Sequence, residues 1–343
     1  MDISIIIPVY NTNIGDFEKC IKSILNQTFE NFEIIVVDDG SKNEIAAYID
    51  DFSRKDSRIV VYHRENKGVS AARNFGISKA QGNYVMFADA DDEFTPWALR
   101  SAMEAAKETQ ANVLIGRILQ TERGNNFECE YKTSNSQKII HLNTTKLLDE
   151  FEKHVFVKNC NTWGRNNEGW MFNGEGCWAH LVDIDTARSN LFEEGLSIGE
   201  DTLWAIRLLE NRNNMKFCLV DAYWYYYYQN EYSVMNTYSK NIESSITKAV
   251  SLLSPLMEKK NCDVQDAYGK WLFIKLKQIV YRYYLANECE MSLVQKIFSI
   301  RNLIATDIWK KALSISEKFK KNEKIKLFLY RSGLIIVLYN LKK

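Results

Sequence analysis

The sequence lacks the features that mark secreted, zinc-binding or membrane-spanning proteins. Its 7 cysteines are odd in number, scattered and never spaced as Cys-x-x-Cys, so neither a disulfide framework nor a zinc cluster is expected. No basic N-terminal region or cleavage pattern precedes the first apolar run, which predicts the absence of a signal peptide. No apolar run approaches the roughly 20 residues that span a bilayer. We therefore expect a cytoplasmic protein with reduced thiols.

The chain also lacks an excess of charge of either sign. Its 44 Lys and Arg residues balance 44 Asp and Glu residues, so a generally basic surface for nucleic acid is not expected. Residues 318–343 depart from this balance, because they hold eight Lys or Arg and a single acid, Glu323. Apolar residues alternate with these basic residues along the segment. The segment is therefore either a solvated helix packed on its own domain or a peripheral contact with the anionic inner face of the plasma membrane.

What the sequence does have is a regular alternation of apolar and amphipathic segments. Residues 3–116 alternate between β-branched runs and helical patterns, which predicts parallel strands joined by helical crossovers. Strands are expected at 3–9, 33–37, 59–62, 84–88 and 113–116, and helices at 14–26, 44–54, 69–79 and 96–109. The predicted fold class is α/β, with a mostly parallel sheet flanked by helices.

The rest of the chain divides into two regions. Residues 120–175 are polar and Asn-rich, and regular patterns return with a helix at 202–210 and a strand at 215–220. From about residue 242 the pattern is helical, which predicts a smaller all-α region at 236–343 that ends in the basic amphipathic tail.

Two acidic clusters follow apolar strands. Asp38-Asp39-Gly40-Ser41 ends the second strand, and Asp89-Ala90-Asp91-Asp92 ends the fourth. Nucleotides bind at the carboxyl ends of strands in α/β sheets, and nearby carboxylates can share Mn²⁺ or Mg²⁺ with a diphosphate. The second cluster therefore favours a metal-bound nucleotide over helix capping, whereas an Asp/Gly turn explains the first cluster equally well.

Three weaker motifs lie at the same predicted edge. Pro8-Val9-Tyr10-Asn11 ends the first strand, where a tyrosine ring can stack on a base, although an ordinary turn explains it better when taken alone. Residues 66–76 bring positive charge and backbone donors from a loop into a helix. Glu200-Asp201 opens a helix, where a carboxylate acts as a general base or, more commonly, compensates the helix dipole.

Taken together, these five motifs resemble, in order and spacing, the family 2 inverting glycosyltransferases of GT-A fold, of the type that assembles bacterial polysaccharides and glycoconjugates. The resemblance covers about residues 3–235. It implies a Rossmann-like GT-A catalytic domain at 1–235, with a nucleotide-binding half at 1–116 and an acceptor-binding half at 117–235. It also implies a UDP-sugar donor, a Mn²⁺ or Mg²⁺ cofactor, and inversion in one displacement.

The resemblance assigns roles residue by residue. The nucleotide pocket would comprise Pro8, Val9, Tyr10, Asn11, Asp39, Asn66, Arg73, Asp89 and Ala90. Asp91 would coordinate the metal with Asp89 beside it, and Asp201 would be the catalytic base supported by Glu200. Relatives often carry basic residues or His near a Ser that folds over the diphosphate. Residues 225–235 lack such side chains, so either Ser233 and the tyrosine hydroxyls of this segment take that place or the segment closes over the diphosphate in another way.

Aromatic residues in the acceptor half provide candidates for acceptor contact. Trp163, Trp170 and Trp178, with His180 nearby, lie between the metal motif and the predicted base. A tryptophan face can stack on a sugar ring, and core packing is an equally good interpretation of the tryptophans. His180 fits a structural role better than that of a second base.

The expected activity is hexosyl or N-acetylhexosaminyl transfer from a UDP-sugar to a hydroxyl of a glycan, lipid-linked or protein-linked acceptor. A nucleotidyltransferase is the first alternative, which is disfavoured because no Gly-rich, basic phosphate loop follows the first strand. A non-catalytic sugar-nucleotide or glycan-binding module is the second, and the presence of both Asp91 and Asp201 argues against it.

Overall fold

The computed structural model describes residues 1–121, 138–157, 170–172, 174, 176–228, 238–315 and 321–341, and the chain divides into two compact units. The first unit comprises Met1–Gly195 and Glu200–Asn230, and the second comprises Leu196–Gly199 and Glu231–Lys343. The main boundary thus lies a few residues before the predicted one at 235/236. A short excursion into the second unit, which the sequence did not predict, immediately precedes Glu200.

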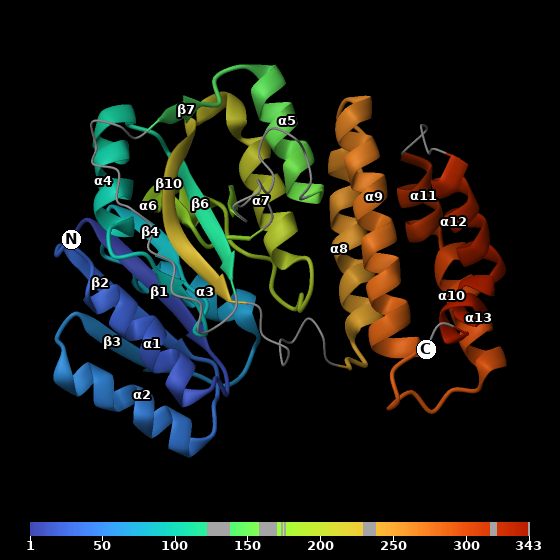
Figure 1. Cartoon of the computed structure of the whole chain (residues 1–343), viewed down its shortest axis with the longest axis horizontal. Coiled ribbons are helices and arrows are strands. Elements are labelled where there is room, and N and C mark those ends of the chain that lie inside the picture. The colour runs from blue at the N-terminus through green and yellow to red at the C-terminus, as the bar shows by residue number, and fades with distance from the viewer. Residues whose placement is uncertain are drawn as a thin grey trace. The chain divides into compact units, whose positions relative to one another are not determined.

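The first unit is an α/β domain built on one large sheet (Figure 1). Its strands are β1 (Ile3–Val9), β2 (Phe32–Asp38), β3 (Ile59–His63), β4 (Tyr84–Phe87), β5 (Glu93–Phe94), β6 (Val113–Thr121), β7 (Ile139–His141), β8 (Trp170–Phe172), β9 (His180–Asp183) and β10 (Phe217–Tyr228). Its helices are α1 (Ile14–Leu25), α2 (Asn43–Lys55), α3 (Val69–Lys79), α4 (Ala98–Thr109), α5 (Thr145–Phe156), α6 (Ile184–Ser189) and α7 (Glu200–Glu210), with a 3₁₀ turn, η2 (Arg212–Asn214).

The described strands are ordered β3-β2-β1-β4-β9-β6-β10-β5, with β7 beside β10 and β8 beside β6. The run β3-β2-β1-β4 is parallel, as the alternation predicted. Beyond β4 the sheet is mixed, because β9 lies between β4 and β6 and is antiparallel to both. The predicted α/β class is confirmed. The sequence did not predict that a strand from after residue 175 would separate β4 from β6.

Close packing of α3 on β1 determines where one side of the site lies. Ala71, Ala72 and Gly76 on α3 are buried, and a Cβ on Gly76 would lie 2.4 Å from Cγ2 of Ile6 in β1. Small side chains therefore let the helix approach the central strand closely. This approach brings Arg73, on the same helix, to the carboxyl edge of the sheet.

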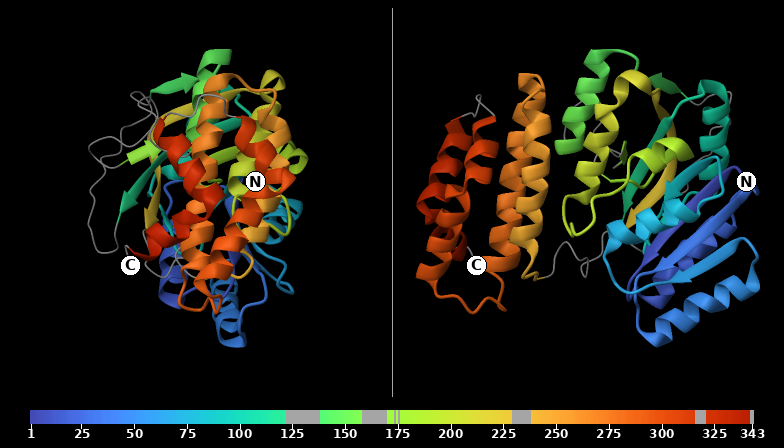
Figure 2. Two further views of the ribbon diagram at one scale, coloured as in Figure 1. Left: turned by 90° about the vertical axis from the view of Figure 1, so that its right-hand side faces the viewer. Right: turned by 180° about the vertical axis from the view of Figure 1, so that it is seen from behind.

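The second unit is helical, as predicted from about residue 242 onward (Figures 1 and 2). It comprises α8 (Ile242–Met257), α9 (Cys262–Ile279), a π-helical turn η4 (Val280–Tyr284), α10 (Leu293–Ala305), α11 (Asp307–Ile315), α12 (Lys321–Ser332) and α13 (Leu334–Asn340). The excursion at Leu196–Gly199 is held here, because Ser245 Oγ accepts the N–H groups of Ser197 (2.9 Å) and Ile198 (3.1 Å). Among the helices that the structure describes, none is long and apolar enough to cross a membrane.

Candidate active site

The predicted nucleotide residues at the end of β1 lie at the carboxyl edge of the sheet. Pro8 and Val9 are the last residues of β1, and the Asp39 N–H donates to the Val9 carbonyl at 2.8 Å. Tyr10 follows and is 56% exposed, so its ring is open to a stacking partner. Asn11 turns the chain with a φ of +50°, and its N–H donates to Ser41 Oγ at 2.9 Å. The first motif thus presents an exposed aromatic ring on a backbone tied to β2.

Asp39 holds the loop that precedes α3. It is only 3% exposed, and its two carboxylate oxygens accept the N–H groups of Lys67 (3.0 Å) and Gly68 (2.7 Å). Gly40 has a φ of +82°, and a Cβ there would lie 3.0 Å from the Asn66 amide nitrogen. Asp39 and Gly40 together bring the exposed Asn66 to the end of β2. The sequence placed Asp39 and Asn66 in one pocket, and the structure brings them together.

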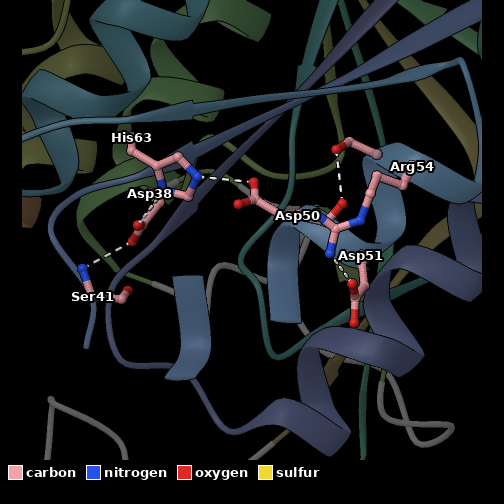
Figure 3. A network of polar contacts seen from close by, with 7 residues as sticks. Asp38, Ser41, Asp50, Asp51, Arg54 and His63 are labelled. Carbon is pink, nitrogen blue, oxygen red and sulfur yellow. Dashed lines mark hydrogen bonds and ion pairs between the residues drawn. The ribbon is translucent and has the colours of Figure 1, made fainter. Parts of the chain in front are cut away.

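A network beside this loop was missed by the sequence interpretation (Figure 3). Buried Asp38 contacts His63 Nδ1 through Oδ2 (2.7 Å) and accepts the Ser41 N–H through Oδ1 (2.9 Å). His63 Nε2 lies 2.9 Å from Asp50 Oδ1 on α2. Hydrogen bonding to Asp38, helped by Asp50 and opposed by burial, raises the pKa of His63. The signal was present in the sequence, because parallel pairing of β2 with β3 places Asp38 opposite His63.

The second acidic cluster forms a tight turn after β4, in which the Asp92 N–H donates to the Asp89 carbonyl at 3.2 Å. Burial, reinforced by the charge of Asp89, raises the pKa of Asp91 to about 6. Burial and the charges of Asp89 and Asp91 likewise raise the pKa of Asp92. Such mutual repulsion suits a divalent cation. Among the described residues, no group of three or more His, Cys, Asp or Glu side chains could hold a metal without further ligands.

Arg73 connects this acidic turn to the predicted base. Its side chain is 3% exposed, with Nη2 3.0 Å from Asp89 Oδ1 and Nη1 2.8 Å from Asp201 Oδ1. Nη1 also lies 3.7 Å from Glu200 Oε1, and the guanidinium lies over the Phe192 ring at 5.2 Å. Residues separated by more than 100 positions therefore meet at one buried cation. The resemblance placed Arg73 in the nucleotide pocket, and the structure shows it paired with the carboxylates.

The acceptor candidates fall into two groups. Trp178 is largely buried and stacks on Tyr225 and Tyr227, with ring centroids 5.8 and 5.1 Å away. His180 is buried, and burial lowers its pKa to about 4, so a neutral ring packs against Trp204. These contacts are typical of core packing. Trp163 and Ser233 lie outside the described residues, and only the backbone of Trp170, in β8, is described.

Part of this chain resembles a known protein family. The family model described as Glycosyl transferase family 2 matches residues 4–175. The chain belongs to this family. It is 31% identical over 186 residues to "GalNAc(5)-diNAcBac-PP-undecaprenol beta-1,3-glucosyltransferase" of Campylobacter jejuni, and 42% identical over 116 residues to Glycosyltransferase GlyG of Streptococcus pneumoniae. The aligned parts cover 52% and 33% of this chain, and 59% and 38% of those relatives.

Solved structures share the fold over the whole chain. Crystal structures of S. aureus TarS 1–349, alone and with UDP, superpose with TM-scores of 0.64 and 0.63 at 15% identity, covering 100% of this chain and 92% of theirs. The complex of the same protein with UDP-GlcNAc gives a TM-score of 0.58 at 16% identity, covering 92% of this chain and 91% of that one. At this level of identity the likeness establishes the GT-A fold followed by helices.

Proposed function

We propose that the chain is a metal-dependent, inverting glycosyltransferase that moves a hexosyl or N-acetylhexosaminyl group from a UDP-sugar to an acceptor hydroxyl. The observation that carries this proposal is the meeting of three elements at one edge of the sheet. These are the loop organised by Asp39, the acidic turn at Asp89 and Asp91, and the carboxylate of Asp201. Complexes of TarS with UDP and UDP-GlcNAc support the choice of uridine donor.

The residues at this edge have distinct tasks in the proposed reaction. Tyr10 offers a ring face to uracil, and the loop held by Asp39 offers the exposed side chain of Asn66. Asp201 takes the proton of the acceptor hydroxyl as that oxygen attacks the anomeric carbon, and Arg73 orients its carboxylate. A divalent cation held by Asp89 and Asp91 would neutralise charge on the leaving diphosphate.

A donor screen tests this proposal. Purified protein is incubated with a panel of UDP-sugars and Mn²⁺, and UDP release is measured for wild type, Asp91→Ala and Asp201→Asn. The proposal predicts release from at least one donor, with a large loss in both variants. If neither substitution reduces turnover of an active donor, the site assignments are wrong.

A second arm of the screen, with UTP and a sugar phosphate, separates the alternatives. A nucleotidyltransferase would release pyrophosphate in this arm. A non-catalytic module would bind UDP-sugar without releasing UDP. The released species therefore identifies the class of protein.

We further propose a cytoplasmic enzyme whose basic tail contacts the inner face of the plasma membrane, and whose acceptor is a glycan, protein or lipid-linked sugar. The undecaprenol-linked substrate in the name of the Campylobacter relative supports a lipid-linked choice. Ile325 and Phe328 on α12 are exposed beside exposed Lys324, Lys326 and Arg331. Apolar and basic side chains on one helix favour anionic lipid.

Vesicle sedimentation of the full chain tests the membrane contact. Lys324→Glu with Lys326→Glu should reduce sedimentation with anionic vesicles, whereas Lys310→Glu with Lys311→Glu, on α11, makes the same charge change elsewhere and should not. Equal sedimentation of wild type and both variants would contradict the membrane contact and leave the donor chemistry untouched.

A further inference from the structure

The acidic turn is tied to strand β10 by the hydroxyl of Tyr225. The Asp89 N–H donates to Tyr225 Oη at 2.9 Å, across 136 positions of sequence. Tyr225 is 0% exposed, and burial, with the charges of Asp92 and Asp89, raises its pKa well above the ordinary value. The residue therefore remains a neutral phenol whose oxygen accepts this hydrogen bond. The sequence placed its run of four tyrosines at the diphosphate and gave no indication of this contact.

Neighbouring rings determine the position of that hydroxyl. Trp178 stacks on Tyr225 with an interplanar angle of 8°, and Phe94 meets it edge-on at a centroid distance of 5.3 Å. The backbone of Tyr225 pairs with Phe94 in the antiparallel β5–β10 ladder. The stacking on Trp178, the edge contact with Phe94 and the backbone pairing together restrict the phenol ring to one position. The oxygen is consequently a fixed acceptor.

Two further contacts hold the turn. Cys20 Sγ lies 3.5 Å from the Asp89 carbonyl, to which it donates a weak hydrogen bond. At the far end of the turn, Asp92 Oδ1 accepts the Tyr228 N–H at 2.9 Å. Strand β10 therefore contacts the turn at both ends, through Tyr225 at Asp89 and through Tyr228 at Asp92.

Electrostatics explains why such anchoring is needed. Asp89, Asp91 and Asp92 are three carboxylates within four residues, and burial strengthens the repulsion between them. Without fixed hydrogen bonds, the turn would relax by separating the carboxylates. A hydrogen bond to the backbone of Asp89 opposes that relaxation without using the carboxylate oxygens, which stay available to Arg73 and to a ligand.

We propose that Tyr225 is a positioning residue that holds Asp89 and Asp91 in the geometry that receives a divalent cation together with UDP. The inference rests on the proposed donor site and adds to it the residue that keeps the site preorganised. Tyr225 acts on the backbone of Asp89 and does not touch substrate. Tyr225 is thus the residue of the tyrosine run that positions the donor site, and it does so from strand β10.

The test compares Tyr225→Phe with Tyr62→Phe, which removes a hydroxyl from a ring on β3 that packs edge-on against Phe75. UDP affinity is measured by calorimetry with MnCl₂ and with EDTA, and thermal unfolding establishes that each variant is folded. Tyr225→Phe should weaken UDP binding roughly fivefold or more in Mn²⁺ and leave it unchanged in EDTA. Tyr62→Phe should match wild type in both. A general loosening of the fold would weaken both measurements equally and would contradict the inference, as would unchanged affinity in Mn²⁺.

Hydrogen exchange on the metal-free protein provides a readout that needs no ligand. The Asp89 amide should be protected in wild type and in Tyr62→Phe, and should exchange faster in Tyr225→Phe. An unprotected amide in wild type would overturn the inference even if Tyr225→Phe did not fold. If wild type binds UDP neither in MnCl₂ nor in EDTA, the proposed function is contradicted. If wild type binds UDP and Tyr225→Phe binds it equally well, only the proposed role of Tyr225 is contradicted.

Discussion

The Arg73 guanidinium lies 2.8 Å from the Asp201 carboxylate, and its other terminal nitrogen reaches Asp89 at 3.0 Å. One buried cation therefore joins the predicted base to the acidic turn. An arginine fork can hold two carboxylates at once, whereas the ammonium of lysine is a compact charge on a flexible stem. This difference allows the role of Arg73 to be tested with its charge retained.

Arg73→Lys should lower kcat more than it weakens UDP binding. A hydrogen bond to a charged group contributes about 1.5–3 kcal/mol, so losing the bond that orients Asp201 predicts a kcat lower by roughly 10- to 150-fold. UDP affinity should stay within about twofold if the main task of Arg73 is to orient Asp201. Steady-state kinetics and calorimetry give the two quantities separately.

The matched control is Arg64→Lys. Arg64 donates to the Ala71 carbonyl of the same helix at 2.8 Å and lies over the Phe75 ring, away from the site carboxylates. The Arg64→Lys variant should leave kcat nearly unchanged. If Arg73→Lys instead weakens UDP binding and spares kcat, Arg73 acts on the nucleotide, as the family resemblance implied.

His63 should make the stability of the first unit depend on pH. Its folded pKa is raised above the ordinary value of 6.5, mainly by Asp38, so the native state binds the proton more tightly than the unfolded state. The stabilisation is complete below about pH 6.5 and is lost as pH rises through the folded pKa. His63→Gln should therefore lower Tm more at pH 6 than at pH 8, as measured by thermal unfolding.

A second histidine bears on this prediction. His180 has the opposite effect on the pH dependence of stability. Its folded pKa is lowered to about 4, so the unfolded state binds the proton more tightly, and stability falls as the pH drops below about 6.5. A His63→Gln effect that is equal at pH 6 and pH 8 would show that the contact with Asp38 carries no charge.

Gly76→Ala should destabilise the protein although alanine favours helices. The gain in helix propensity is about 1 kcal/mol, but the new methyl group would meet Ile6 Cγ2 at 2.4 Å, inside a fully buried core. Overpacking of this kind costs about 1–3 kcal/mol, so a net loss of about 1 kcal/mol is expected by denaturant unfolding. Ser78→Ala, on the exposed side of the same helix, should change stability by less than about 0.5 kcal/mol. Stabilisation by Gly76→Ala would show that α3 can move away from β1 at no cost.

The sequence predicted those parts of the fold that depend on local pattern. Helix 69–79 matches α3 residue for residue, and β1 to β4 lie at the apolar runs that predicted strands, two of which end in acidic clusters. The position of β9 between β4 and β6 was missed, because pairing between distant strands leaves no local signal. The run Tyr225–Tyr228 was assigned to a segment closing the site and is instead the end of β10. Its register with β5 and β6 comes from tertiary pairing.

For the site, the motifs named most of the residues but not how they are connected. Asp89, Asp201 and Arg73 were each singled out, yet their meeting depends on how α3 and α7 pack, which no spacing in the sequence encodes. His63 was missed because it acts through a carboxylate contact rather than within a motif, and for Tyr225 the sequence did not predict the contact with the Asp89 backbone. Parallel register would have identified His63, whereas Tyr225 required the structure.

The most direct test of the account is the separation of donor binding from transfer in Asp201→Asn and Asp91→Ala. Both are measured for UDP affinity in Mn²⁺ and for turnover of the active UDP-sugar. Asp201→Asn should bind UDP about as tightly as wild type and lose at least about 100-fold in turnover, because the amide cannot accept the proton of the acceptor hydroxyl. Asp91→Ala should lose both. Turnover within a few fold of wild type in Asp201→Asn would contradict the assignment of the base.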